Sequence, residues 1–209
     1  MHSTVTDVDA AVSAIREGGL AVIPTDTVYG LVSTPYRDEP VRRLSELKRR
    51  SPEQPFAIVA SSLDWLLECV PELRGRSAVV ARALVPGPYT LVLPNPAKRF
   101  PWLGGKRTDT IGVRVPELTG PGKEVLEKVG AVAATSANLH GYDDPRRVAD
   151  VPEEIRSAAV VLDGGELPGV PSTVVDLTAP EPRVLREGVV SAEEALARVE
   201  AALARWSAE

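Results

Sequence analysis

Two spacings of apolar residues alternate along this chain. Short uninterrupted apolar runs predict buried strands, whereas apolar residues that return every three or four positions predict helices with one buried face. The runs predict strands at 20–23, 56–60, 89–93, 110–115, 131–134, 160–163, 173–177 and 183–186. The wider spacing predicts helices at 8–17, 38–50, 63–69, 77–84, 121–129, 152–158 and 191–206.

The order of these elements predicts the fold class. Strands and helices alternate imperfectly, and the strand 183–186 follows 173–177 so closely that the two can form a hairpin. We therefore expect an α/β fold with an open, twisted sheet that mixes parallel and antiparallel strands and is flanked by helices. No linker divides the chain, so residues 1–209 are predicted to form a single domain.

The last helix carries a clear start signal. Ser191 and Glu194 have the spacing of a capping box, in which each side chain bonds a free backbone N–H group of the first turn. Its apolar stripe predicts the face that docks on the sheet, namely Ala195, Leu196, Val199, Leu203 and Trp206.

Composition narrows the class of protein. Hydrophobic residues make up 44% and charged residues 25% of the 209 residues, which is typical of a globular chain. The net charge of -5 argues against nucleic-acid binding through the overall field, although a local basic patch can still act. No apolar run approaches the roughly 20 residues of a membrane span, and the first residues contain no apolar leader. We therefore expect a cytoplasmic protein.

Several familiar chemistries lack their residues here. The single cysteine, Cys69, cannot form an internal disulfide and lies on a predicted helix, so we expect it to pack in the core. With only two histidines, His2 and His140, a structural zinc site is not expected. Residues 100–107 lack the first glycine and the hydroxyl residue of a Walker-type phosphate loop, and no Gly-x-Ser-x-Gly elbow occurs.

Polar residues follow the first predicted strand. The stretch 20–31 begins with an apolar run and changes at Pro24 to the polar residues 25–27. Two interpretations stay open: a turn closed by side-chain hydrogen bonds, or a polar strand end that opens into a ligand crevice. Residues 29 and 30 are expected to shape the turn, and Asp26 is left without an assigned role.

Four cations end helices or strands elsewhere in the chain. Arg114 is the most unusual, because an arginine inside an apolar strand needs either solvent on one face or an anionic partner. The others are Lys48 and Arg50 at the end of a helix and Arg186 at the end of a strand. If these ends share one edge of the sheet, they converge on a polyanionic ligand, and a nucleoside triphosphate and a small carboxylate are the candidates. The alternative is helix-end electrostatics with solvent exposure.

Six motifs in order give the chain a resemblance to a known family. They are Pro-Thr-Asp-Thr-Val-Tyr-Gly-Leu at 24–31, Lys-x-Arg at 48–50, Pro-Gly-Pro at 86–88 with Thr90, Ile-Gly-Val-Arg-Val-Pro at 111–116, Thr-Ser-Ala-Asn at 135–138 and Pro-Ser-Thr-Val-Val-Asp at 171–176. Together they resemble the YrdC-type family of L-threonylcarbamoyl-AMP synthases, over residues 18–188. The resemblance implies a YrdC-like fold in the short, single-domain form.

The resemblance also implies a reaction. Members of this family combine L-threonine, bicarbonate and ATP into threonylcarbamoyl-AMP and pyrophosphate. The product serves the t6A modification of tRNA through a downstream threonylcarbamoyl-transferase machinery. Mg²⁺ would bridge the ATP phosphates, with no metal ligand assigned to the protein, and catalysis would consist of positioning and cationic stabilisation.

Matching motif positions imply the site residues. Those implied to contact L-threonine are Thr27, Arg114, Ala134 and Ser172. Those implied to contact ATP are Arg50, Gln54, Thr110, Ser136 and Arg186. Those implied to be catalytic are Lys48, Arg50, Ser136 and Asn138. On this basis we expect Arg114→Ala to abolish threonine-dependent pyrophosphate release without unfolding the protein.

Departures from the family pattern keep two alternatives open. The chain has Leu-His-Gly at 139–141, Gln-Pro-Phe at 54–56, and Val59 where long members carry a histidine. One alternative is a YciO-like paralogue that uses another acceptor. The other is a module that binds double-stranded RNA or the ribosome through basic residues of the predicted loop 95–109, which are Lys98, Arg99, Lys106 and Arg107.

Overall fold

A single mixed sheet organises the protein. The computed structural model describes residues 7–51 and 53–208. Its nine strands lie in the order β7-β1-β2-β6-β3-β5-β4-β8-β9. They are β1 (Ala21–Pro24), β2 (Tyr29–Ser33), β3 (Ala57–Ala60), β4 (Tyr89–Pro94), β5 (Thr110–Arg114), β6 (Ala131–Ser136), β7 (Val160–Val161), β8 (Thr173–Asp176) and β9 (Arg183–Arg186). The pairs β1–β7, β3–β5 and β4–β8 are parallel and the other pairs antiparallel, which confirms the expected mixed sheet.

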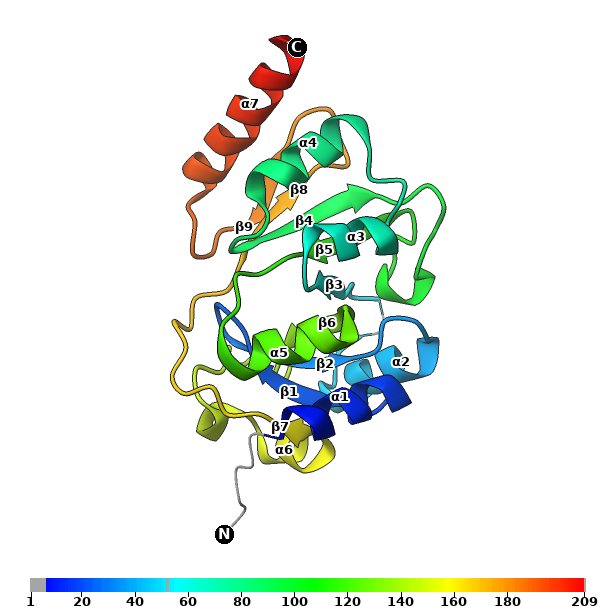
Figure 1. The fold of residues 1–209 in the computed structure, drawn as a ribbon, viewed down its shortest axis with the longest axis vertical. Helices are drawn as coiled ribbons and strands as arrows, with labels where there is room; N and C mark the ends of the chain where they lie inside the picture. The colour runs from blue at the N-terminus through cyan, green and yellow to red at the C-terminus, as the bar shows by residue number, and fades with distance from the viewer. Residues whose placement is uncertain (1–6, 52, 209) are drawn as a thin grey trace.

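Helices cover the sheet from both sides. They are α1 (Val8–Glu17), α2 (Asp38–Leu47), α3 (Leu63–Cys69), α4 (Gly75–Leu84), α5 (Gly120–Val129), α6 (Glu153–Ala158) and α7 (Ala192–Ala208), with single 3-10 turns at Pro101–Leu103 and Val148–Asp150. Figure 1 shows α7 at one end of the elongated molecule and α6 with β7 at the other. The caps predicted for α1 are present, because the Asp7 carboxylate accepts from Ala10 N at 2.9 Å and Gly18 ends the helix with φ 89.

The two faces of the sheet carry separate hydrophobic cores. On one face α1 and α5 pack Ile15, Val125 and Leu126 against β1, β2 and β6. On the opposite face α2, α3, α4 and α7 bury the larger core, which includes Leu44 and Leu91. Along β3, β4, β5 and β8 the residues that point away from this larger core are not covered by a helix and line a cleft instead.

The hairpin of β1 and β2 differs from the sequence prediction. The predicted strand 20–23 is present, but a second strand, β2, follows at once and pairs with it antiparallel, with Pro24 opposite Tyr29. Tyr29 and Gly30 therefore belong to a fully buried strand and do not shape the turn. The short apolar run after the polar residues was the available signal, and Gly30 within it weakened the strand pattern.

Other predictions have mixed outcomes. The β8–β9 hairpin is present, and Cys69 is buried, as expected. Ser191 Oγ accepts from Glu194 N at 3.2 Å, but the Glu194 carboxylate pairs with Arg198, so only half of the capping box forms. Trp206 is 45% exposed, which contradicts its predicted docking, because α7 packs on α4, β8 and β9 and its last turns extend past the sheet (Figure 1).

Two features named in the sequence analysis, His2 and the absence of a membrane span, depend on which residues the structure describes. His2 lies outside the described residues. Within residues 7–51 and 53–208, no helix is both long and apolar enough to cross a membrane.

Candidate active site

A cleft of about 620 Å³ opens on the same face of the sheet as α1 and α5, over the strands that these two helices do not cover. Because side chains alternate between the two faces of a strand, every second residue of five strands contributes to its floor. The floor residues are Ala57, Val59, Thr90, Val92, Gly112, Arg114, Ala134, Ser136, Ser172 and Val174. Ala57 lies opposite both Gly112 and Ala134, so the centre of the floor carries no side chain larger than a methyl group. A ligand can therefore approach the backbone there.

Every residue that the sequence resemblance assigned to the site lines this one cleft. The set comprises Thr27, Lys48, Arg50, Gln54, Thr110, Arg114, Ala134, Ser136, Asn138, Ser172 and Arg186. They come from β5, β6 and β9, the turn between β1 and β2, the residue just before β8, and the segments that follow α2 and β6. The structure thus brings them together, while their individual roles stay predictions.

The turn between β1 and β2 is held by Thr25. Its Oγ1 accepts from Thr27 N and Val28 N, both at 3.2 Å, and donates to Val28 O at 2.6 Å. The interpretation of a turn closed by side-chain hydrogen bonds is therefore correct, with a threonine in place of an Asx residue. The turn also lines the cleft, so both interpretations of residues 25–27 apply.

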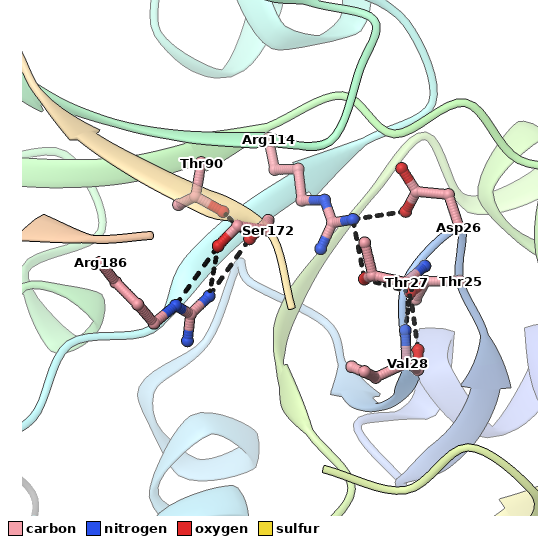
Figure 2. Close-up of polar contacts among 8 residues, drawn as sticks. All are labelled: Thr25, Asp26, Thr27, Val28, Thr90, Arg114, Ser172 and Arg186. Carbon is pink, nitrogen blue, oxygen red and sulfur yellow. Dashed lines mark hydrogen bonds and ion pairs between the residues drawn. The ribbon is translucent and has the colours of Figure 1, made fainter. Parts of the chain in front are cut away.

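Arg114 has the anionic partner that its position in a strand demands. Its Nη2 donates to Asp26 Oδ1 and, at 3.0 Å, to Thr27 Oγ1, as Figure 2 shows. The side chains of the pair are only 11% and 12% exposed. Burial raises the pKa of Asp26 and lowers the pKa of Arg114, while the attraction between the two charges acts in the opposite direction on each. The pair is thus a desolvated ion pair at the wall of the cleft.

A second cation lies near Arg114. Arg186 donates from Nη2 to Ser172 O at 2.9 Å, and Ser172 Oγ forms a 2.8 Å hydrogen bond with Thr90 Oγ1 (Figure 2). The positive charge of Arg186 contributes to the lowered pKa of Arg114, so the two guanidinium groups lie close together. This end of the cleft, which we call the double-arginine end, is lined by Thr27, Arg114, Ser172 and Arg186, and Asp26 pairs with Arg114 without lining the cleft.

The other two cations are placed by the way α2 ends. Arg49 adopts φ 53, and the backbone N–H groups of Arg49 and Arg50 donate to Glu46 O and Ser45 O. This is the Schellman arrangement, which reverses the chain after a helix. As a result Lys48 and Arg50 both line the cleft, whereas Arg49 points outward to Glu154 at 2.9 Å. The predicted helix end at residues 48–50 is therefore a capping turn beyond α2.

Arg49→Gly should leave the protein unchanged in stability or make it more stable by about 0.5–1 kcal/mol. Glycine adopts positive φ without the steric cost that arginine bears, and the exposed pair with Glu154 contributes little. Urea unfolding measures the difference. Arg42→Gly, in the middle of α2 on its exposed side, is the matched control and should cost about 1 kcal/mol. A loss for Arg49→Gly as large as that of the control would contradict the Schellman assignment.

Lys48 is held by the end of β6. Its Nζ donates to Ser136 O and, at 2.7 Å, to Asn138 Oδ1. Ser136 Oγ donates to the same Asn138 oxygen at 2.7 Å, and Asn138 Nδ2 donates to Asp144 Oδ1 at 3.1 Å. Burial and the nearby positive charge of Arg50 lower the pKa of Lys48 to about 8, although Asp144 acts in the opposite direction. Lys48 is thus a buried amine whose charge can be lost near pH 8.

Arg50 is fixed on all sides by protein groups. Its Nε donates to Gln54 Oε1 at 2.6 Å, Nη1 to Thr135 Oγ1 at 3.1 Å and Nη2 to Pro55 O at 2.8 Å. Its guanidinium carbon lies 5.0 Å from the ring centroid of Phe56, which adds a cation–π contact. Lys48 and Arg50 therefore form a second cationic end of the cleft, which we call the Lys-Arg end.

Sequence reasoning did not identify several partners of these groups. Asp26 was unassigned, and Thr135 was quoted only as part of a motif. Asp144 is the one carboxylate among the described residues that line the cleft. Phe56 was placed at the start of a predicted strand and noted as a departure from the family pattern, although an aromatic residue so close to a Lys-x-Arg motif was a usable signal for a stacked arginine.

The basic residues of the loop 95–109 are largely neutralised. Arg99 pairs with Glu72 at 2.7 Å, Lys106 with Glu53 at 2.8 Å and Arg107 with Asp109 at 3.7 Å. None of these residues lines the cleft. A cationic surface for RNA therefore finds no support in this loop.

The described residues do not form a metal site on their own. No group of three or more histidine, cysteine, aspartate or glutamate residues among them could hold a metal ion. A cation in the cleft would thus need ligand atoms from a bound anion, with Asp144 as the available carboxylate.

Known proteins resemble this chain in sequence and in fold. A family model, Sua5_yciO_yrdC, described as "Telomere recombination", matches residues 13–188. The chain is 36% identical over 186 residues to the threonylcarbamoyl-AMP synthase of Pyrococcus abyssi, which covers 88% of this chain and 54% of that protein. It is 34% identical over 186 residues to the putative threonylcarbamoyl-AMP synthase of Mycobacterium tuberculosis, with 88% and 85% covered.

One solved relative carries an amino acid. The crystal structure of P. abyssi Sua5 complexed with L-threonine superposes with a TM-score of 0.83 at 34% identity, over 91% of this chain and 56% of that one. The chain therefore spans about half the length of its archaeal relative.

Proposed function

Since this chain belongs to the Sua5/YciO/YrdC family, we propose that it makes L-threonylcarbamoyl-AMP from L-threonine, bicarbonate and ATP, with release of pyrophosphate. The product would serve the t6A modification of tRNA through a separate transferase machinery. Such a reaction is a nucleotidyl transfer, and it would take place in the cytoplasm.

The observation that carries the proposal is a single cleft with two cationic ends. At one end the charge of Arg50 lowers the pKa of Lys48, and at the other the charge of Arg186 lowers the pKa of Arg114. Among the described residues, no hydrogen bond joins the side chains of the two ends. Such a cleft would hold two anionic ligands side by side, a polyphosphate at one end and a carboxylate at the other.

The double-arginine end suits the amino acid. Arg114 offers a guanidinium to a carboxylate, and Thr27 and Ser172 offer hydroxyl groups for the side-chain hydroxyl of threonine. Ala134 leaves room on the floor beside them. The P. abyssi relative binds L-threonine, which supports the same ligand here.

The Lys-Arg end suits ATP. The carbamate formed from the threonine amine and bicarbonate, with loss of water, would attack the α-phosphorus through an oxygen while pyrophosphate leaves. Charge then grows on the phosphoryl oxygens, and Lys48 with Arg50 would stabilise it while Ser136 and Asn138 hold Lys48 in place. Gln54 and Thr110 line the same cleft and would complete the nucleotide contacts.

Mg²⁺ would accompany ATP in this proposal. Mg²⁺ is commonly held by substrate phosphates, waters and one or two carboxylates, and Asp144 is the carboxylate that the described lining offers. When bound, the ion would neutralise charge on the phosphates.

Product analysis tests the proposal and separates it from an acceptor other than threonine. The full chain is incubated with ATP, bicarbonate and each amino acid in turn, and products are identified by mass spectrometry. We expect threonylcarbamoyl-AMP with L-threonine and no comparable adduct with serine, valine or alanine. An adduct with another acceptor, and none with threonine, would replace the proposal by the YciO-like alternative.

A further inference from the structure

The unassigned carboxylate of Asp26 is the group from which a further role follows. It lies at the hairpin turn in the middle of a motif, yet it does not line the cleft. It contacts Arg114, which does. Asp26 can therefore orient a ligand only through Arg114, while its charge also acts on the ligand through space.

One nitrogen of the Arg114 guanidinium donates two hydrogen bonds, whereas another donates none. Nη2 bonds Asp26 and Thr27, whereas Nε is buried and has no hydrogen-bond partner among the described residues. A buried donor without an acceptor destabilises the folded protein. Because Arg114 lines the cleft, a ligand oxygen that reaches its guanidinium would add an acceptor to those of Asp26 and Thr27, so the residue is prepared for an anion.

Asp26 is itself held in place. The backbone N–H groups of Asp26 and Glu117 lower the pKa of the Asp26 carboxyl, so this carboxylate lies close to the connection that follows β5 as well as in the hairpin. Arg114, near the end of β5, is thereby fixed relative to the β1–β2 turn. The direction of its free donors depends on this attachment.

The charges at this end of the cleft sum to a single positive charge. Arg114 and Arg186 each contribute one positive charge and Asp26 contributes one negative charge. One carboxylate brings the sum to zero, whereas a phosphate dianion would leave an excess of negative charge. Without Asp26 the sum would be two, which suits a dianion.

We propose that Asp26 is a positioning residue that aims the free donors of Arg114 at a single carboxylate and, by its charge, keeps multiply charged phosphates out of the amino-acid end of the cleft. The inference rests on the proposed function only in taking the carboxylate to be that of L-threonine. Asp26 acts through Arg114 and does not touch the substrate.

Titration calorimetry of the full chain tests this, with L-threonine as ligand and inorganic phosphate as competitor. Asp26→Asn keeps the shape of the side chain and removes its charge. We expect its Kd for L-threonine to rise about tenfold, as expected when a buried charge pair is broken, and phosphate to compete about tenfold more strongly. The stronger competition should vanish in the double variant Asp26→Asn with Arg114→Gln, which locates it at Arg114.

Two further variants keep the test decisive. Asp26→Glu retains the charge but moves the carboxylate, so it should weaken threonine binding while phosphate competes as in the wild type; it also replaces Asp26→Asn if that variant fails to fold. Asp9→Asn removes the acid of an exposed pair with Lys128 and should change neither value. A threonine Kd within twofold of wild type in Asp26→Asn, or unchanged phosphate competition, would overturn the proposal.

Failure of the proposed function has a different signature. If the wild type binds another amino acid and not threonine, the assigned acceptor is wrong. The same Asp26 variants are then titrated with that amino acid, and the expected changes are the same.

Discussion

Arg114→Gln should lose threonine-dependent pyrophosphate release by about a hundredfold or more, with the KM for ATP unchanged. In the proposed function this guanidinium binds the carboxylate of threonine, and loss of one partner of a buried charge pair costs about 2–5 kcal/mol. The measurement is pyrophosphate release at varied threonine and fixed, saturating ATP. Wild-type turnover in this variant would refute the assignment of Arg114.

The structure changes the expected effect of removing the Arg114 side chain on the stability of the fold. The sequence led us to expect that Arg114→Ala leaves the fold intact, but removal of Arg114 leaves the buried Asp26 without its cation. Such an unpaired charge costs about 3–5 kcal/mol. Urea unfolding of Arg114→Gln should show this loss, and adding Asp26→Asn should recover most of it without recovering activity. Recovery of both would mean that Arg114 acts only on the fold.

Lys48→Met should lower the rate of adenylate formation by about 10²- to 10³-fold, because in the proposed reaction it removes a fixed cation at the place where phosphoryl charge develops. In the wild type, kcat/KM for ATP should fall above about pH 8, where the free enzyme loses the Lys48 proton. Lys48→Arg should move this fall to higher pH, because a guanidinium stays charged. Lys123→Met, on the exposed side of α5, is the control and should keep the wild-type rate and profile.

Stability should depend on pH through the same lysine. Its pKa in the folded protein, about 8, is below the value near 10.4 of an unfolded chain, so the unfolded state binds more protons between these values. Stability from this group therefore rises with pH from about 8 to 10, by about 3 kcal/mol at most, and below pH 8 the full cost of burying the charge is present. Urea unfolding of wild type and Lys48→Met at pH 8 and pH 10 measures the difference; an equal pH response in both would contradict the lowered pKa.

Hydrophobic spacing predicted most of the fold because most elements follow simple patterns. The strand of Thr110–Arg114 and the helix Val8–Glu17 have uniform runs and recognisable caps, so their positions were close to those observed. β2 was missed because it follows β1 after only four residues and contains a glycine. Trp206 was misplaced because a helix stripe predicts a buried face but does not tell where the sheet ends.

The site was predictable as a set of residues but not as a set of contacts. Motif matching selected residues that all line one cleft in the structure. It did not predict the pairing of Arg114 with Asp26, which joins residues 88 positions apart. The contact of Arg50 with Thr135 spans 85 positions. Such pairings depend on strand order, and the spacing of motifs along a chain does not encode that order.

Because the floor of the cleft carries no side chain larger than a methyl group, substitutions in the sheet can change the depth of the cleft. A Cβ added at Gly112 would meet Ala57 at 3.5 Å, an ordinary contact distance, so a side chain there can be accepted by the backbone. Enlarging Ala57, Gly112 or Ala134 would shorten the span available to a bound molecule while every hydrogen-bonding group stays in place. These three positions are therefore where an engineer would adjust the size of the acceptor without rebuilding the chemistry.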